Sequence, residues 1–219
     1  MDPRAALAAS ELLGAVDEEA ATRLAGAARV RSLRRHDVVY TEGSRATELY
    51  VVMAGRIAIA RRAPGGRRTV TALVGAGEVF GEVGLLDDGD RPAEARALEP
   101  AQVLALGYEA VRAELDRRPR LLWDVVRILA RRLRAADAAL AEVRALDVTA
   151  RTARRLLELA GDADEMVLPV TQEELADLVG ASRERVNKAI ASFVRQRWLA
   201  RVDRHYRILD RAQLARRAR

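Results

Sequence analysis

Residues 171–190 read TQEELADLVGASRERVNKAI, and this stretch predicts two short helices joined by a tight turn. Thr171, followed three residues later by Glu174, has the pattern of a capping box, which begins a helix. Gly180 suits the turn, and Ser182 is a good N-cap for a second helix. Two helices separated by so short a glycine-bearing turn predict a helix-turn-helix.

The second predicted helix has an apolar face, formed by Val186, Ile190 and Phe193, and a polar face. The residues predicted to point outward are Arg183, Glu184, Arg185, Asn187 and Lys188. Residues early in this helix of a helix-turn-helix reach base edges in the major groove. Because arginine can fork onto guanine and glutamate can accept from the cytosine amine, Arg183 and Glu184 are predicted to read bases.

Lys188 is the only lysine in a chain whose other 37 basic side chains are arginine. It follows Glu184 by one helical turn, and its flexible ammonium can donate to a guanine or thymine oxygen. The alternative is an ordinary i,i+4 ion pair with Glu184, worth about 0.3–0.5 kcal/mol. Both interpretations stay open from the sequence.

The C-terminal part of the chain is basic. Residues 182–219 contain 12 Lys and Arg against three acidic residues, a net charge of +9, which leaves −3 for the rest. This block indicates a polyanion partner, with a solvated basic tail as the alternative. LARV (199–202) and YRIL (206–209) predict a β-hairpin wing, so residues 147–219 are expected to form a winged helix-turn-helix.

Composition excludes several kinds of chemistry. The 219 residues include no cysteine and only two histidines, so there is no thiol nucleophile or disulfide, and a histidine-based metal site or catalytic triad is hard to assemble. We therefore predict that the protein is not an enzyme and has no metal site. No apolar run approaches a membrane span and no signal peptide is evident, so we expect a cytoplasmic protein with no membrane partner.

The region from about 30 to 106 predicts a compact β-domain. Short apolar runs alternate with Gly, Pro and Asp, which favours a sandwich, roll or barrel. GRIAIARR (55–62) alternates strictly, as a strand with one buried face does, and APGGRR (63–68) predicts a tight turn. Ahead of this region, Asp17 is a candidate N-cap for a short helix.

One long helix is predicted from Arg120 to Ala145, with a new helix capped by Asp147 after a hinge. Its apolar residues recur in steps of four and three, the seam of a two-helix coiled coil. The alternative is packing of this stripe on the β-domain. The predicted dimerisation residues are Leu122, Val126, Leu129, Leu133, Ala136, Leu140 and Val143.

In this order of parts the chain resembles the cyclic-AMP receptor protein/FNR family of bacterial transcription regulators. Three stretches carry the resemblance: FGEVGLLDDGDRPAEARA, LARRLRAADAALAEVRALDVTAR and TQEELADLVGASRERVNKAI. It implies an α+β fold with a cyclic-nucleotide-binding-type β-roll domain (1–118), a dimerisation helix (119–146) and a winged helix-turn-helix DNA-binding domain (147–219). A homodimer is then expected to read a TGTGA-like inverted repeat in double-stranded DNA.

The resemblance also implies site residues. Arg183, Glu184 and Lys188 match base-reading positions, while Thr171, Ser182 and Arg185 match positions near phosphates. The implied ligand-binding residues are Gly81, Glu82, Val83, Arg91, Ala93, Arg132 and Asp137. In such a pocket, Glu82 accepts from a ribose hydroxyl, Arg91 neutralises a phosphate and Arg132 braces Glu82.

Cyclic AMP or another nucleotide is the candidate ligand, but two positions depart from the family pattern. Pro92 has no N–H for a phosphate, and Ala136 cannot hydrogen-bond to adenine through its side chain. A ligand-independent regulator therefore stays open. So does a cyclic-nucleotide-binding regulatory subunit that acts on a protein partner. The acidic loop 161–165 is a candidate RNA polymerase contact, with a solvated loop as the alternative.

Overall fold

The computed structural model describes residues 2–14, 16–62 and 68–219. Its contacts divide the chain into two compact units, Met1–Arg134 and Ala135–Arg219. The fold is mixed α and β, as predicted. The predicted division into a β-roll domain (1–118), a dimerisation helix (119–146) and a DNA-binding domain (147–219) stays a prediction. The predicted turn at 63–68 lies largely outside the described residues.

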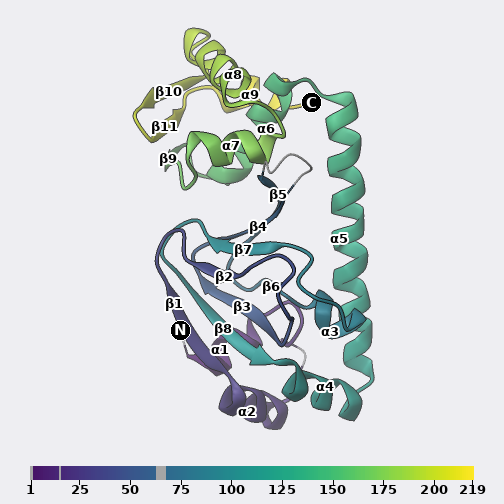
Figure 1. Ribbon diagram of the computed structural model, residues 1–219. Coiled ribbons are helices and arrows are strands. Elements are labelled where there is room, and N and C mark those ends of the chain that lie inside the picture. Colours follow the sequence, from purple (N-terminus) through teal and green to yellow (C-terminus); the bar gives the residue numbers. More distant parts are fainter. Residues whose placement is uncertain (1, 15, 63–67) are drawn as a thin grey trace. The chain divides into compact units, whose positions relative to one another are not determined.

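The first unit is built on two four-stranded sheets (Figure 1). One sheet has the order β1-β8-β3-β6, and the other has the order β2-β7-β4-β5. Their strands are β1 (Arg29–Leu33), β2 (Val38–Tyr40), β3 (Glu48–Ala54), β4 (Ile57–Arg62), β5 (Arg68–Val74), β6 (Val79–Phe80), β7 (Glu94–Ala97) and β8 (Ala101–Gly107). All of the pairings are antiparallel, which matches the predicted roll.

Strand β3 is buried on both faces, which explains its continuous apolar sequence. Tyr50 and Val52 face the core between the sheets, while Leu49 and Val51 face a second core beneath the helices. Helices α1 (Pro3–Ala8), α2 (Glu18–Ala27), α4 (Tyr108–Arg117) and α5 (Arg120–Ala145) border this second core, and α3 (Val83–Asp87) is a short helix after β6. Asp17 caps α2 as predicted.

The strict alternation predicted for β4 is wrong. Ile57, Ala58 and Ala60 are all buried, and Ile59 is half-buried. A register shift between Ile59 and Ala60 in the pairing with β5 re-aims the side chains, as a β-bulge does. Small alanines fit against neighbouring structure on either face, so their sequence pattern carries little information about burial.

The second unit contains the predicted helix-turn-helix. Its helices are α6 (Val148–Ala160), α7 (Gln172–Val179), α8 (Arg183–Arg195) and α9 (Arg211–Arg217). Thr171 and Glu174 form the predicted capping box, and Asp147 and Ser182 cap α6 and α8. Gly180 ends α7 at φ +68°, the left-handed conformation that glycine adopts without steric cost.

The wing has three strands rather than the predicted two. The hairpin β10 (Leu199–Val202) and β11 (His205–Ile208) forms as expected. A third strand, β9 (Glu165–Val167), pairs with β11 and begins at the last residue of the predicted acidic loop 161–165. A three-residue strand lacks the length for a periodic signal, so only the pairing with β11 reveals it.

Candidate functional site

The recognition helix α8 presents the predicted charged face. Arg183, Glu184, Arg185 and Lys188 are exposed, and Val186, Ala189, Ile190 and Phe193 are buried. The prediction that Asn187 points outward is wrong: the residue is half-buried, and no described residue forms a hydrogen bond with its buried Oδ1. The exposed face therefore consists of three cations and one carboxylate in the first two turns.

Thr171 and Ser182 lie at the N-termini of α7 and α8, and both are exposed. The Thr171 hydroxyl accepts from the Glu174 N–H at 3.1 Å, and the Ser182 hydroxyl accepts from the Arg185 N–H at 3.4 Å. Helix N-termini carry unpaired N–H groups and a positive dipole end, which favour anions. Glu173 and Glu174 add negative charge to the first turn of α7, and phosphate contacts at Thr171 and Ser182 stay a prediction.

Helix α6 holds the turn of the helix-turn-helix in place. Arg151 Nε donates to the carbonyl of Val179 at 2.9 Å, and Arg155 Nε donates to the carbonyl of Leu178 at 3.3 Å. Both acceptors lie in the last turn of α7, where helix carbonyls lack intrahelical partners. These contacts fix α7, and with it the start of α8, to α6.

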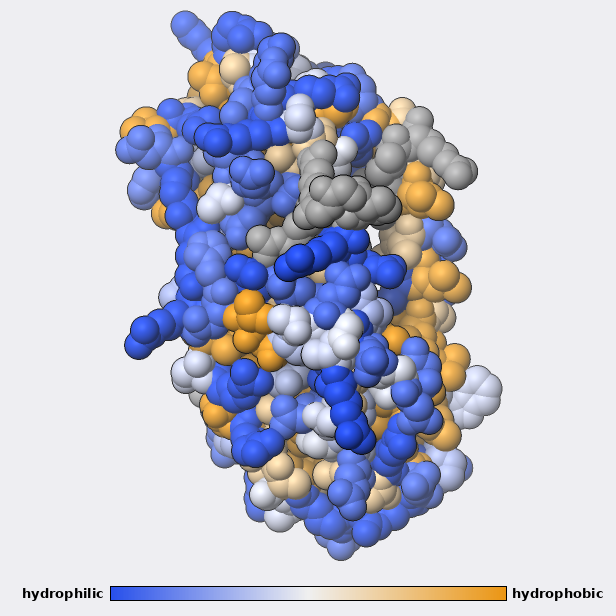
Figure 2. All heavy atoms as spheres, in the orientation of Figure 1, coloured by the Kyte–Doolittle hydropathy of each residue, from blue (hydrophilic) through white to orange (hydrophobic). Residues whose placement is uncertain are grey.

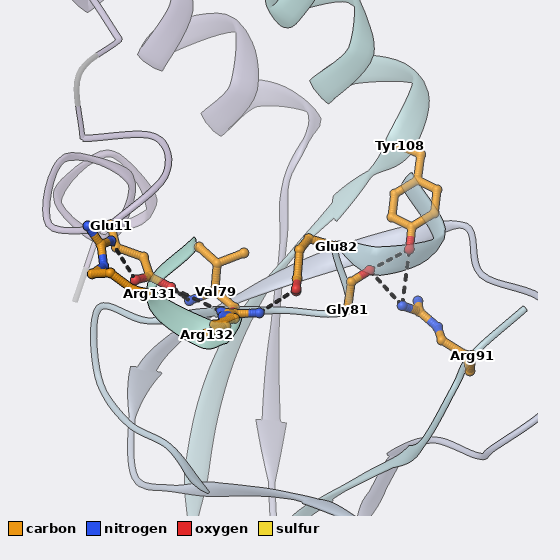
Figure 3. A network of polar contacts seen from close by, with 8 residues as sticks. All are labelled: Glu11, Val79, Gly81, Glu82, Arg91, Tyr108, Arg131 and Arg132. Carbon is orange, nitrogen blue, oxygen red and sulfur yellow. Dashed lines mark hydrogen bonds and ion pairs between the residues drawn. The ribbon is translucent and has the colours of Figure 1, made fainter. Parts of the chain in front are cut away.

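Two of the predicted pocket residues, Glu82 and Arg132, are in contact (Figure 3). Arg132 Nη1 donates to Glu82 Oε1, and the Glu82 side chain is almost fully buried. Burial alone would lower the pKa of the Arg132 guanidinium, but the charges and hydrogen bonds of Glu82 and Glu11 raise it above its usual value. Arg132 therefore contacts Glu82 as the resemblance implies.

Arg91 is only 4% exposed, and its guanidinium is engaged by the fold. Nη1 donates to the Gly81 carbonyl at 2.8 Å and to the Tyr108 hydroxyl at 3.2 Å, while Nη2 donates to the Glu48 carbonyl at 2.6 Å. The guanidinium carbon lies 4.0 Å from the ring centroid of Tyr40. Such stacking stabilises a buried cation.

The aromatic surroundings of Arg91 were missed by sequence reasoning. Tyr50 stacks on Phe80 with 5.0 Å between ring centroids, and Tyr40 lies 5.9 Å from Tyr50. Burial raises the pKa of Tyr40 and raises that of Tyr50 to about 12, so both rings stay neutral near pH 7. No local pattern marks these tyrosines, because they come from separate strands and meet only in the folded sheets.

The other predicted pocket residues have different environments. Gly81 has φ +77°, and a Cβ there would lie 2.7 Å from Arg91 Nη1, so a side chain would displace the guanidinium. Ala93 is buried, Val83 is exposed at the start of α3, and Asp137 is exposed on α5. Within the described part of the chain, two buried polar atoms, Glu82 Oε2 and Arg91 Nε, have no hydrogen-bond partner.

Helix α5 carries two apolar stripes. Leu121, Val125 and Ile128 are buried in the core of the first unit. The predicted seam is a different stripe and is exposed, with side chains 38–64% accessible at Leu122, Val126, Leu129, Leu133 and Leu140. The exposed stripe forms much of the hydrophobic surface in Figure 2. The contact with the core of the first unit is therefore made by Leu121, Val125 and Ile128 and not by the predicted seam.

Two further seam positions complete the description. Ala136 is exposed, and the side chain of Val143 lies outside the described part of the structure. Trp123, beside the seam, is 66% exposed and was missed by the sequence analysis. A large aromatic ring in water next to an unpartnered leucine stripe is typical of a contact surface.

The fold and these sites define a DNA-binding regulator with a nucleotide-binding type of β-domain, and comparisons with known proteins agree. Residues 30–118 match the cyclic nucleotide-binding domain model, and residues 150–217 match the Crp-like helix-turn-helix domain model. The chain is 38% identical over 192 residues to the CRP-like cAMP-activated global transcriptional regulator of Mycobacterium tuberculosis, a match that covers 84% of this chain and 86% of that protein.

Solved structures of transcription regulators have a similar fold. A CRP-family transcriptional regulator of Thermus thermophilus has a TM-score of 0.73 at 30% identity, covering 86% of this chain and 96% of that one. The c-di-GMP responsive global regulator CLP of Xanthomonas campestris has a TM-score of 0.75 at 25% identity, covering 88% and 99%.

The chain belongs to the cyclic-AMP receptor protein/FNR family of DNA-binding transcription regulators. It is a regulator rather than an enzyme, as predicted, because relatives of at least 30% identity are named transcriptional regulators. The helix-turn-helix match also argues against a regulatory subunit that acts only on a protein partner. Among the helices of residues 2–14, 16–62 and 68–219, none has the length and apolar character to span a membrane.

Proposed function

We propose that the protein is a homodimer that reads a TGTGA-like inverted repeat in double-stranded DNA. The observation that carries this proposal is the exposed face of α8, where Arg183, Glu184 and Lys188 lie together at the start of the helix. A carboxylate among these cations would weaken a contact made only with phosphates. It is therefore best explained by base reading.

The exposed seam of α5 supports the dimer. Parallel two-stranded coiled coils bury a stripe of this spacing against the same stripe of a second copy. A symmetric dimer places two recognition helices in major grooves one helical turn apart, which matches an inverted repeat. Because the partner is DNA, we place this activity in the cytoplasm.

We also propose that Glu82 and Arg91 bind a nucleotide, with cyclic AMP as the first candidate. Glu82 Oε2 is a buried acceptor and Arg91 Nε is a buried donor, and neither has a hydrogen-bond partner among the residues that the structure describes. An unsatisfied buried polar group costs about 1–3 kcal/mol, so a ligand hydroxyl and an anionic oxygen would each gain by binding there. The M. tuberculosis relative is named as cAMP-activated.

A ligand-independent regulator is the second candidate, and Arg91 supports it. Nη1 donates to the Gly81 carbonyl and the Tyr108 hydroxyl, and Nη2 donates to the Glu48 carbonyl, so three of the five guanidinium N–H donors are already used by the fold. Pro92 adds no N–H. These two features predict weak binding of any cyclic phosphate.

Contact with RNA polymerase through residues 161–165 stays a prediction. Asp164 is paired with Arg211 at 3.0 Å and Glu165 with Arg207 at 2.6 Å, which neutralises part of this acidic segment. A polymerase contact would therefore involve these ion pairs rather than isolated carboxylates.

Fluorescence anisotropy on a TGTGA-N6-TCACA duplex at physiological salt tests the proposal, with a scrambled duplex as control. Specific binding that needs cyclic AMP supports the nucleotide pocket, and specific binding without it supports the ligand-independent regulator. Equal affinity for both duplexes under all conditions would contradict the predicted half-site.

A further inference from the structure

We infer that Glu11, from the segment that precedes the β-roll, is a positioning residue for the ligand-binding carboxylate Glu82. This inference rests on the proposed nucleotide pocket and adds a residue to it. Glu11 lies on the opposite side of Arg132 from Glu82, so one guanidinium is shared by two carboxylates (Figure 3).

The contacts of Glu11 are specific to each oxygen. Its Oε1 accepts from Arg132 Nη2 at 3.1 Å and from the backbone N–H of Val79 at 3.3 Å. Its Oε2 accepts from Arg131 Nη2 at 3.3 Å. Arg132 Nη2 also donates to the Val79 carbonyl. Glu11 therefore joins two arginines of α5 to strand β6.

The backbone around Glu11 is itself held firmly. The Glu11 N–H donates to the Gly77 carbonyl at 3.0 Å, and the buried Ser10 hydroxyl accepts from the Leu13 N–H at 2.9 Å. Leu12 and Leu13 are buried in the core beneath the helices. A carboxylate on so rigid a segment can hold the guanidinium that it binds in one orientation.

The orientation of Arg132 decides which oxygen of Glu82 is available. Arg132 Nη1 donates to Glu82 Oε1, whereas Glu82 Oε2 is buried and no residue in 2–14, 16–62 or 68–219 forms a hydrogen bond with it. With Nη2 fixed by Glu11 and Val79, Nη1 points at Glu82 and cannot rotate freely. Oε2 is thus the atom presented to a hydroxyl group of a ligand, such as the hydroxyl of a ribose.

Glu11→Gln is the test variant, because glutamine keeps the size and an acceptor oxygen but loses the charge that holds Arg132. Glu18→Gln is the matched control, since it removes the same charge from an exposed side chain of the same N-terminal segment. Arg132→Gln and the double variant complete a cycle. Binding of cyclic AMP and cyclic GMP is measured by calorimetry, and thermal unfolding is measured in parallel.

We expect Glu11→Gln to weaken nucleotide binding about threefold to tenfold, the size typical of coupling between groups in contact. In the Arg132→Gln background the same change should have no further effect, because Glu11 acts through Arg132. An equal loss in both backgrounds, or a lower unfolding temperature with unchanged affinity, would show that Glu11 only anchors the N-terminal segment and would overturn the inference.

A ligand-free measurement separates this inference from the nucleotide proposal. The guanidinium protons of Arg132, assigned by their loss in Arg132→Gln, are followed by NMR in the free protein. Slow guanidinium rotation in the wild type that becomes fast in Glu11→Gln supports the positioning role, even if neither nucleotide binds and the ligand proposal fails. Rotation that Glu11→Gln leaves unchanged overturns it.

Discussion

The Nζ of Lys188 lies 2.8 Å from Oε1 of Glu184 across one turn of α8, and both side chains are 76% exposed. The ion pair that was the simpler interpretation of this lysine therefore forms in the free protein. It does not exclude base contact, because an ammonium has three protons and one ion pair occupies only part of this capacity. The pair holds Glu184 and Lys188 side by side before DNA arrives.

Replacing Glu184 tests base reading directly. We expect Glu184→Gln to lose about 1–3 kcal/mol of discrimination at one base pair of each half-site, because the amide no longer offers a carboxylate to cytosine. Non-specific affinity should rise, since a charge that repels phosphates is removed. Anisotropy with a series of single-base substitutions measures both effects. Glu109→Gln, an exposed change in the other unit, should leave the base preference intact.

The exposed seam of α5 predicts the effect of a charge at its centre. Leu133→Glu should abolish the dimer and weaken binding to the full repeat, because burying a carboxylate in an apolar seam is strongly unfavourable. Ala138→Glu adds the same charge at an exposed position off the seam and should leave the dimer intact. Sedimentation equilibrium measures both; a Leu133→Glu protein that remains dimeric would place the interface elsewhere.

Arg91 predicts a stability effect that needs no ligand. Arg91→Gln should lower the free energy of unfolding by about 2–4 kcal/mol in the absence of nucleotide, since it leaves the Gly81 and Glu48 carbonyls without their donor. Arg34→Gln, an exposed change on the same unit, should cost under about 0.5 kcal/mol. Urea denaturation compares them, and equal stabilities would show that Arg91 serves only a ligand.

The buried carboxylate of Glu114 predicts a pH dependence. Its Oε1 and Oε2 accept from Arg23 at 2.7 and 3.0 Å, and Oε1 also accepts from Arg117 at 2.8 Å. These bonds, chiefly that of Arg23, hold the pKa of Glu114 below its usual 4.5. The stabilisation is therefore complete above pH 4.5 and is lost as the pH falls through the lower folded-state pKa.

Glu114→Gln should accordingly cost about 1–3 kcal/mol at pH 7 and flatten the loss of stability in acid. Glu19→Gln removes an exposed carboxylate that also pairs with Arg23, and it should have little effect. Urea midpoints measured from about pH 3 to about pH 7 compare both variants with the wild type. Parallel acid curves for Glu114→Gln and the wild type would contradict the assignment.

The C-terminal helix predicts a change confined to the second unit. Arg217 Nη2 bonds both oxygens of Asp147, at 2.7 and 2.5 Å, and Asp147 caps α6. Arg217→Gln should destabilise this unit by about 0.5–1 kcal/mol, and Arg216→Gln, its exposed neighbour, should not. Fluorescence of Trp198, which stacks on Phe193, reports this unit in a Trp123→Phe background. Identical denaturation curves for the two variants would deny the ion pair a role.

The local parts of the structure could be predicted from the sequence. The capping box at Thr171, the caps at Asp147 and Ser182, the glycine at 180 and the whole of α5 were all predictable. Each depends on hydrogen bonds or apolar spacing between residues a few positions apart. The face of α8 that carries Arg183, Glu184 and Lys188 follows from the same periodicity.

The arrangement of Glu82, Arg91 and Arg132 was decided by tertiary structure. Arg132 meets Glu82 and Glu11 across 50 and 121 residues, and Arg91 reaches the Glu48 carbonyl across 43. Hydrogen bonds between residues so far apart in the sequence produce no periodic pattern, because the separation of the partners depends on how the strands and helices pack. The sequence by itself determined the helix-turn-helix and the helical seam, whereas only the packing of sheets and α5 determined which oxygen of Glu82 and which nitrogen of Arg91 remain free.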